Sequence, residues 1–554
     1  MEDRDPTYDR WTKDALIRRI QYLEANLRNG GPNPEAVPEP TTVAAAEGDA
    51  ASPLKKKKVK GKIDPSKYAT RLVAFKLAYL GKRYGGFEYA AHANQPTIEE
   101  ELWKAFVKTC LIFPEKPDEV NWDSWEYSKC GRTDRGVSAF GQVIAVRVRS
   151  NRPLPKEEQP AEASQGDENG EAVEPKDEAE EAEKVKKEKR EFNDFTDEIQ
   201  YCRLLNRILP RDIRMLAWCP TTPADFSARH DCSERQYRYF FTQPAFAPIP
   251  QSIENPANAS QKLKSGWLDI EAMRKAAKKF EGLHDFRNFS KIDPSKINVK
   301  FDRRIFESDI VEVKDAGTAL PFLDREEFRP AGMDLQEKFP KVYYFHVRGT
   351  AFLWHQIRCM VAIIFLVGQG LEDPSIVDKL LDFEAEPRRP NYQLADDVPL
   401  VLWDCKFPRP EKPENALDWV YVGEDNPLNQ HGSHALLTNM WEYWRERKLD
   451  ELLASQLLDV ISSQADISLR RDQKAPLHIP FTVRTFEGGN KERLAGKYQQ
   501  VLQKPRGASA AEVFDREARR KGYADAAEWR EALLKRKQEA GARTSAGDLE
   551  EGTE

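Results

Sequence analysis

Hydrophobic and polar residues alternate with the period of a β-strand in several segments of the chain. In Leu72–Tyr79, every second residue from Val73 onward is large and apolar or aromatic. Three more segments are strand-like, either through the same alternation or because they are rich in β-branched and aromatic residues: Gln142–Val148, Arg235–Phe241 and Lys341–Arg348. We therefore predict a strand in each of these four segments.

Between the predicted strands, apolar residues recur at intervals of three and four positions. This spacing places them on one face of a helix and predicts helices over Ile98–Cys110, Ile270–Phe280 and Trp354–Val367. Strands that alternate with amphipathic helices predict an α+β fold, in which mixed or antiparallel sheets carry helices on one face. In the third helix, the stripe expected to face the core consists of Ile357, Val361, Ile364 and Phe365.

The first sixty residues have a different character. Trp11–Arg28 is predicted to form a short helix with a coiled-coil-like apolar stripe, too short to stand alone, that docks on a partner or on the body of the protein. Gly30–Ala51 is rich in Pro, Ala and Glu and is expected to be a disordered linker. The basic cluster Lys55–Lys62 is compatible with a nuclear-import signal, a phosphate-contacting arm or a solvated run of charge.

A second stretch of biased composition, 156–190, carries 13 Asp and Glu against 7 Lys and Arg and has no aromatic residue, Leu or Ile. It cannot bury enough apolar surface to offset the entropy cost of ordering, so we predict a disordered insertion. Because its negative charge repels nucleic acid, we place it away from any binding cleft. Further along, Trp441–Ile461 is expected to form a buried helix and Ala510–Ala540 a charged helical tail.

Composition excludes several classes of protein. The 554 residues carry a net charge of −6, and no run of 18 or more apolar residues exists, which excludes an ordinary membrane-spanning helix. The charged N-terminus lacks the apolar core of a secretory signal, so we do not expect secretion. The cysteines form no C-x-x-C pair, which argues against a disulfide framework and a structural zinc site and favours a reducing compartment. The seven are Cys110, Cys130, Cys202, Cys219, Cys232, Cys359 and Cys405.

The strongest candidate for chemistry is Lys129–Val143, with the sequence KCGRTDRGVSAFGQV. Gly131 and Gly136 bracket a polar run that contains Asp134 and precedes the strand predicted from Gln142. The fragment T-D-R-G by itself is more often a tight turn than a site. The full string, however, resembles the G-R-T-D-x-G-V-x-A signature of the TruA family of tRNA pseudouridine synthases.

Other segments match the same family in the same order along the chain. They resemble its L-N-x-x-L-P, its F-x-A-R followed by R-x-Y-R-Y, its F-x-G-x-H-D-F, its helix with a functional Arg and its closing P-x-x-L strand. The resemblance extends over about Tyr68–Pro408, apart from the acidic insertion, and so many ordered matches do not arise by chance. The segments are Leu204–Pro210, Asp225–Phe240, Phe280–Ser290, Gly349–Gly370 and Asp396–Cys405.

The chain also departs from the bacterial members of this family. Those members commonly have Ala and His where this chain has Arg135 and Ser138, and His where it has Ser227. The segment Gly86–Ala90, the N-terminal helix and the long C-terminal extension look more like the eukaryotic branch that modifies positions 38 and 39 of tRNA. These departures concern the choice of substrate rather than the chemistry.

The resemblance implies a role for three residues. Asp134 is the expected nucleophile, Arg358 its cationic partner, and Tyr237 stacks on the target base and takes part in proton removal. A carboxylate can attack a carbon atom and later depart; burial raises its pKa, and a neighbouring guanidinium lowers that pKa again. Attack on C1′ and a glycal route both stay open. Because the reaction is an isomerisation, we expect neither a cofactor nor a metal.

Further residues are expected to contact the RNA. Arg132 would keep the flipped nucleotide out of the helix or, more simply, support the turn, and Leu402 with Pro399 would form an apolar wall under the base. Basic residues near aromatic ones would bind phosphates beside stacked bases. These are Lys82, Arg83, Arg135, Arg229, Arg235 and Arg238.

These predictions divide the chain into four regions. Residues 1–67 hold the N-terminal helix and basic linker, 68–235 and 236–408 form two catalytic subdomains around a basic cleft, and 409–554 form a partly helical extension with a disordered tail. The expected partner is tRNA, bound with an affinity that falls steeply with salt. By analogy with bacterial members we expect a homodimer, and we expect the protein in the nucleus and the cytoplasm.

Two other functions are compatible with the sequence. One is a multi-site eukaryotic synthase of the same family that acts on other tRNA positions or other RNAs. The other is an RNA-binding protein or chaperone without activity, against which the intact Asp134, Tyr237 and Arg358 argue. A zinc base deaminase is excluded, because the chain lacks its H-x-E and P-C-x-x-C motifs.

Overall fold

The computed structural model describes residues 63–91, 93–154, 192–247, 266–314, 340–432, 435–464, 483–495, 497–536 and 538. All of them belong to one compact unit, Ile63–Glu554. The predicted helix Trp11–Arg28, the linker and basic cluster up to Lys62, and the acidic stretch 156–190 lie outside the described residues.

One mixed sheet is the main feature of the described residues. Its strands follow the order β10-β4-β1-β3-β9-β5-β8-β7-β6, and β2 pairs with β3 beside this path. A separate two-stranded pair is formed by β11 (Val483–Thr485) and β12 (Arg493–Ala495). The strands of the main sheet are β1 (Ala69–Tyr79), β2 (Ser128–Lys129), β3 (Ser138–Ser150), β4 (Ile213–Cys219), β5 (Glu234–Gln243), β6 (Gly282–Asp285), β7 (Asp302–Val313), β8 (Lys341–Gly349), β9 (Leu400–Lys406) and β10 (Val420–Tyr421).

The helices differ widely in length. The shortest is α8 and the longest is α9, and a further helix spans 526–536. Short 3₁₀ turns include η3 (Gly81–Arg83), which lies beside the site described below. The α-helices are α2 (Ile98–Lys108), α4 (Tyr201–Asn206), α5 (Ile270–Lys278), α6 (Gln356–Gly368), α7 (Ile376–Leu381), α8 (Leu428–His431), α9 (Leu436–Gln464) and α10 (Ala510–Arg520).

The four predicted strands and the three helices predicted between them are confirmed, with ends that shift by a few residues. The strands are β1, β3, β5 and β8, and the helices are α2, α5 and α6. The α+β content is confirmed, but one mixed sheet replaces the separate sheets that we expected. The pattern gave no prediction for β4, which is buried on both faces and therefore lacks a period of two, or for β7, which buries few of its residues.

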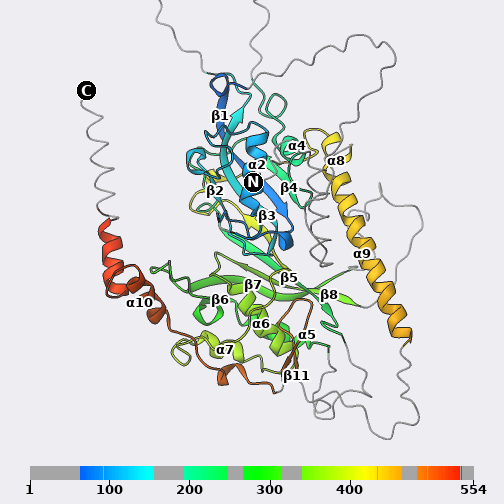
Figure 1. Cartoon of the computed structure of the whole chain (residues 1–554), viewed down its shortest axis with the longest axis vertical. Coiled ribbons are helices and arrows are strands. Elements are labelled where there is room, and N and C mark those ends of the chain that lie inside the picture. Colours follow the sequence, from blue (N-terminus) through cyan, green and yellow to red (C-terminus); the bar gives the residue numbers. More distant parts are fainter. Residues whose placement is uncertain are drawn as a thin grey trace, which may run out of the picture. The chain divides into compact units, whose positions relative to one another are not determined.

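The main sheet has two halves that meet at a narrow seam. At this seam β3 and β9 run parallel and pair through Ser138 with Val401 and Ala139 with Leu402. The other neighbouring strands of the sheet are antiparallel. Figure 1 shows β1 to β4 grouped with α2 and α4, and β5 to β8 grouped with α5, α6 and α7. The residues just before β3 therefore lie where the two halves join.

Each half has its own hydrophobic cluster. In the first half, α2 and α4 pack on β1, and the predicted inward face of β1, from Val73 to Tyr79, is fully buried. The second cluster is built around α6, in which twelve of the thirteen residues are buried. The four residues predicted to face the core are all buried, which confirms that stripe, but α6 is enclosed on all sides and buries its other faces as well. Its one incompletely buried residue is Arg358.

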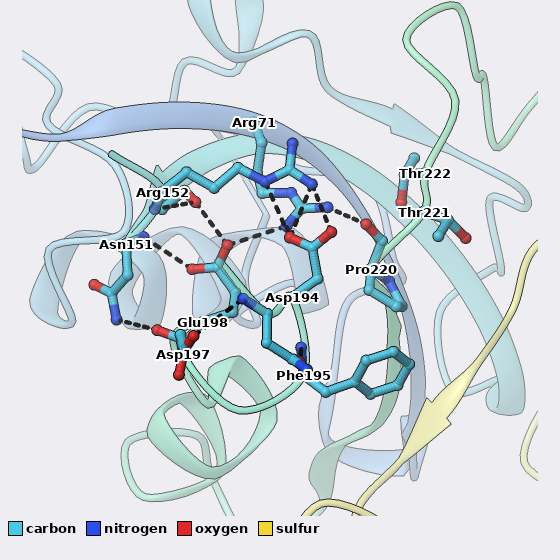
Figure 2. Close-up of polar contacts among 12 residues, drawn as sticks. Arg71, Asn151, Arg152, Asp194, Phe195, Asp197, Glu198, Pro220, Thr221 and Thr222 are labelled. Atoms are coloured by element: carbon cyan, nitrogen blue, oxygen red, sulfur yellow. Dashed lines mark hydrogen bonds and ion pairs between the residues drawn. The ribbon is translucent and has the colours of Figure 1, made fainter. Parts of the chain in front are cut away.

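A buried charge network fixes the chain where it returns to the body after the acidic stretch (Figure 2). Arg71 of β1 donates from Nη1 to Asp194 at 2.9 Å and to Glu198 at 3.0 Å, and its Nη2 donates to the carbonyl oxygen of Pro220. The carboxylate of Glu198 also accepts hydrogen bonds from Ser150 and from the backbone of residues 151 and 199. Each charge is thus paired and hydrogen-bonded, as burial requires.

The C-terminal extension is part of the body of the protein. Val420 of β10 belongs to the first hydrophobic cluster, while Phe486 and Val501 are buried in the second. A third cluster joins Phe514 of α10 and Trp529 to Ile297 and Phe301 of the preceding region. The extension beyond residue 408 therefore contributes to all three hydrophobic clusters found among the described residues.

The prediction for Trp441–Ile461 is confirmed in part. The segment is helical and lies within α9, but it is not buried. Its apolar side chains remain exposed, among them Leu449, Leu453 and Leu457. The prediction of burial was wrong because it took apolar content alone as a sign of packing. No helix in the described part of the chain is both long and apolar enough to cross a lipid bilayer.

Candidate active site

The loop between β2 and β3, which carries Asp134, is held in place from several sides. The hydroxyl groups of Thr133 and Tyr79 lie 2.7 Å apart, and the carbonyl oxygen of Thr133 accepts a hydrogen bond from the backbone of Phe87 at 3.0 Å. The side chain of Gln142 pairs with both backbone groups of Gly131. The residues on either side of Asp134 are therefore fixed, which pre-orients its carboxylate.

A tight turn follows Asp134 and requires glycine at position 136. The backbone N–H of Val137 donates to the carbonyl oxygen of Asp134 at 3.2 Å, and Gly136 has a φ of +78°. A Cβ atom at Gly136 would lie 2.5 Å from Oδ1 of Asp397, so a larger residue fits neither the backbone nor the space. This glycine lets the loop approach the segment that leads into β9.

Asp134 opens into a cavity of about 680 Å³ at the seam of the sheet. Tyr237 of β5 and Arg358 of α6 line the same cavity, so the fold brings together the three residues predicted to carry the chemistry. Phe352 and Leu400 add apolar surface, and the volume falls within the range of ordinary small-molecule sites. A flipped base with its sugar can be accommodated in such a space.

The carboxyl group of Asp134 has a raised pKa. Burial is the largest cause, and Asp397 adds to it; Arg358 acts most strongly in the opposite direction, followed by a hydrogen bond from Trp354. The side chain is 30% exposed and lines the cavity. The Arg358 guanidinium therefore offsets part of the cost of keeping this carboxylate charged.

Arg358 is held by the segment that leads into β9. Its Nε donates to the carbonyl oxygen of Ala395 at 2.8 Å, and its Nη1 lies 3.7 Å from Oδ2 of Asp397. Its side chain is 15% exposed, at the surface of the cavity, on a helix that is otherwise buried. A cation fixed in this way keeps a constant influence on the charge of Asp134.

His355 was not predicted as a site residue, yet it contacts Asp134 directly. Its Nε2 lies 3.5 Å from Oδ2 of Asp134, and it precedes α6 with a left-handed φ of +61°. Burial, reinforced by the charges of Arg358 and Lys291, lowers the pKa of His355 to about 4. The imidazole is therefore neutral near pH 7 and gives Asp134 a polar neighbour without a second positive charge.

Tyr237 lies between the two hydrophobic clusters of the sheet. Its ring meets Phe352 edge to face, with ring centroids 5.2 Å apart, and Leu402 of β9 is its partner across the strands. Burial raises the pKa of its hydroxyl group far above the neutral range. Tyr237 is therefore a neutral phenol, which can donate or accept a hydrogen bond at the surface of the cavity.

Six of the seven predicted RNA-binding cations divide into three groups. Arg132 and Arg229 are exposed and line the cavity, and Arg132 also forms an ion pair with Glu88 at 3.2 Å. Arg235 lines the cavity too, but its guanidinium donates to the carbonyl oxygens of residues 130, 229 and 350. Three more cations are exposed but lie outside the cavity. They are Lys82 and Arg83 in η3, and Arg135 in the Asp134 loop itself.

Two predicted contacts are placed elsewhere by the structure. Arg238 does not line the cavity: its neighbour Tyr237 does, and successive residues of a strand point to opposite faces. Its guanidinium instead stacks on Trp403 at 3.7 Å. Leu402 is fully buried next to the Asp134 loop, and Leu400 takes its expected place on the wall of the cavity. The period of two along β5 explains the correction for Arg238, whereas Leu400 and Leu402 lie on the same face of β9 and differ in their position along the strand.

Comparison with known proteins identifies the family. A profile described as tRNA pseudouridine synthase matches residues 276–408. The tRNA pseudouridine(38/39) synthase of Homo sapiens is 34% identical over 467 residues, which cover 84% of this chain and 78% of that protein. This chain belongs to the tRNA pseudouridine synthase family. The enzyme of the same name from Saccharomyces cerevisiae is 37% identical over 416 residues, which cover 75% of each chain.

More distant pseudouridine synthases also match. The tRNA pseudouridine synthase A of the archaeon Methanococcoides burtonii is 26% identical over 353 residues, which cover 63% of this chain and 86% of that protein. Members of the pseudouridine synthase family are isomerases. The family profile covers α6 with Arg358 and most of the second half of the sheet, while the longer alignments extend well beyond it.

Proposed function

We propose that this protein converts uridine to pseudouridine at positions 38 and 39, in the anticodon stem-loop of tRNA, with Asp134 as the nucleophile. The observation that carries the proposal is the convergence of Asp134, Tyr237 and Arg358 on one cavity at the seam of the sheet. Positions 38 and 39 are taken from the names of the human and yeast relatives.

The reaction rearranges bonds without any net change in atoms. The bond between C1′ and N1 breaks, the uracil turns, and C5 bonds to C1′; the proton at C5 is lost, and N1 gains one. Asp134 acts in its charged form, with Arg358 keeping its pKa from rising further. Tyr237 lies at the wall of the cavity, where its ring can stack on the base and offset the cost of flipping it out.

Replacement of the nucleophile tests this function. Asp134→Ala should abolish pseudouridine formation in unmodified tRNA, while the fold and the affinity for tRNA stay close to those of the wild type. Asp118→Ala, which removes an exposed carboxylate that does not line the cavity, is the matched control and should keep full activity. Product formed by Asp134→Ala would rule out the proposed role, and an RNA-binding protein without activity would yield no product even as wild type.

The modified positions are tested in cells. tRNA from cells that lack the protein should lose pseudouridine at positions 38 and 39, and the wild-type gene should restore it. Loss at other positions, or in other RNAs, would assign the protein to a multi-site synthase instead. Binding of tRNA in vitro should weaken steeply between about 50 and 200 mM salt, because Lys and Arg side chains release counterions from the phosphates.

The proposal includes a homodimer in the nucleus and the cytoplasm. The exposed leucines of α9 form an apolar surface that suits contact with a second copy, and Leu16–Leu27 offers another such stripe in the sequence. The basic cluster Lys55–Lys62 supports nuclear import. Light scattering of the full chain and of a chain without residues 1–30 tests the dimer, and a fluorescent fusion with the cluster changed to alanine tests import.

A further inference from the structure

Three cysteines that are far apart in the sequence meet beneath the candidate active site. Their Sγ atoms all lie within 4.8 Å of one another, and all three side chains are buried. Among the described residues, no other group of three potential metal ligands comes this close together. The members of this cysteine triad are Cys130, Cys232 and Cys405.

The register of the sheet produces this convergence. Cys405 of β9 is paired with Arg235 of β5, and Cys232 lies three residues before Arg235. Cys130 ends the segment that enters the Asp134 loop, and its backbone N–H donates to Val143 of β3 at 2.9 Å. The triad therefore contains cysteines from both halves of the sheet, at the seam. Because the three are far apart in the sequence, a search for C-x-x-C pairs does not detect them.

The spacing of the sulfur atoms suits a soft metal ion. With a zinc–sulfur distance of about 2.3 Å, a tetrahedral site has sulfur atoms about 3.8 Å apart. Each pair in the triad therefore needs to close by roughly 1 Å at most, a movement within the reach of side-chain rotation. Cys130 also lines the cavity, which gives an ion a path to the site and solvent for a fourth ligand.

The charge of such a site is balanced by its surroundings. Three thiolates around a divalent ion carry one net negative charge, which is costly to bury unless a cation lies nearby. The guanidinium of Arg235 is held beside the triad, with two of its nitrogen atoms donating to the carbonyl oxygen of Cys130 at 3.4 and 3.0 Å. In this position Arg235, which was also predicted to bind phosphate, can supply the compensating charge.

We propose that Cys130, Cys232 and Cys405 form a thiolate site for a zinc-class divalent ion beneath the Asp134 loop. Binding replaces three S–H bonds with three metal–sulfur bonds and releases three protons, with no change in oxidation state. The ion clamps the start of the Asp134 loop to β5 and β9. It acts on structure, not on the substrate, so the proposal is independent of the proposed function.

Metal content and spectroscopy of the wild-type protein test the site directly. Full-length protein purified without chelator should contain about one zinc ion per chain by native mass spectrometry. After removal of the metal under reducing conditions, Co²⁺ should produce a thiolate-to-cobalt charge-transfer band that saturates at about one equivalent and is displaced by Zn²⁺. A chain without bound metal that gives no such band with Co²⁺ would overturn the proposal.

Matched cysteine variants assign the ligands. Cys232→Ala and Cys405→Ala should lose the bound ion and the cobalt band, whereas Cys202→Ala, at a buried cysteine outside the triad, should keep both. If the triad variants do not fold, the wild type still decides: its thermal midpoint should fall when the ion is removed and recover with Zn²⁺. An unchanged midpoint, or a disulfide within the triad in metal-free protein, counts against the site.

Discussion

At the scale of single residues, the charge state of Asp134 is set by neighbours with opposite effects. Burial and Asp397 raise its pKa, while Arg358 and a hydrogen bond from Trp354 lower it, and the net pKa lies above the ordinary value of 3.8. His355 touches the same carboxylate but stays neutral near pH 7. Arg358 is thus the principal cation that favours the reactive, ionised form.

Removal of that cation should shift the pH dependence of the reaction. Because Asp134 acts when deprotonated, activity falls as the pH drops through its pKa. Arg358→Met removes the main influence that lowers this pKa, so the acid limb should move to higher pH, while Arg358→Lys should move it less. The measurement is the single-turnover rate against pH; identical acid limbs in wild type and Arg358→Met would contradict the assignment.

The hydroxyl group of Tyr237 offers a second test at this scale. Tyr237→Phe keeps the ring and its edge-to-face contact with Phe352, so stacking and tRNA affinity should change little. If the hydroxyl takes part in proton removal, turnover should fall by about 10²-fold or more. Rates and dissociation constants measured on the same tRNA separate the two effects, and a wild-type rate would leave Tyr237 with a stacking role alone.

Some site residues could be predicted from sequence and others could not. Asp134, Tyr237 and Arg358 stand at recognisable positions of sequence motifs, and the structure brings them to one cavity. His355, which has a left-handed backbone conformation, lies 3.5 Å from Asp134, and no residue pattern indicates either feature. Arg238, in contrast, was misplaced although the period of two along its strand already set it opposite Tyr237.

At the scale of elements, the network around Arg71 holds the segment with Asp194 and Glu198 against β1 and β3. Arg71→Met leaves the carboxylate of Glu198 buried without its cation, and we expect a loss of about 3–5 kcal/mol in the free energy of unfolding. Arg152→Met, which removes an exposed partner of Asp194, should cost much less. Denaturant titration measures both; equal losses would show that burial does not set the cost.

The same network predicts how stability depends on pH. Burial acts to raise the pKa of Glu198, but hydrogen bonds from Asn151, Ser150 and Ile199 and from Arg71 outweigh it, and the net pKa is lowered. An acid with a lowered pKa stabilises the folded state above its unfolded pKa of about 4.3, and this stability is lost as the pH falls through the folded pKa. When the thermal unfolding midpoint is measured as a function of pH, Glu198→Gln should therefore show a smaller fall at acid pH than the wild type.

The elements themselves were predictable where the pattern was simple. The helical spacing in α2 and α5 matches the structure, because each of these helices buries a single face. The alternation in β1 matches from Phe75 to Tyr79, whereas residues 71–75 are buried on both faces. β4 is enclosed on both faces and carries no such period. The spacing in α6 predicted the helix but not that it is enclosed on all sides. For α9 the error was the opposite one. Its apolar residues led us to predict burial, yet they are exposed in the described part of the chain.

At the scale of the whole molecule, the C-terminal extension completes the hydrophobic clusters. Phe486 is 1% exposed and packs against Phe365 of α6, with ring centroids 5.0 Å apart. No periodicity in the sequence links these two residues, which are separated by more than a hundred positions. The division of the chain at residue 408 therefore reflects the extent of the family motifs and not the extent of the packed core.

Removal of the Phe486 side chain should lower the stability of the whole fold. Phe486→Ala leaves a cavity beside α6 and should cost about 3–5 kcal/mol. Leu494→Ala, in the neighbouring β12, removes a side chain that is 69% exposed and serves as the control, with a change near zero. Thermal unfolding of both variants checks this; a stable Phe486→Ala would mean that the extension only covers the surface.

The seam between the halves also has a consequence for synthesis on the ribosome. β9 lies between β3 and β5 in the sheet, yet it begins at Leu400, after both neighbours have been translated. After the end of β3 at Ser150, the ribosome adds 249 residues before β9 begins, a delay of roughly 10–50 s at ordinary elongation rates. During that interval β3, and β5 once it has been translated, each present an unpaired edge, so the nascent chain should depend on chaperones until β9 inserts between them.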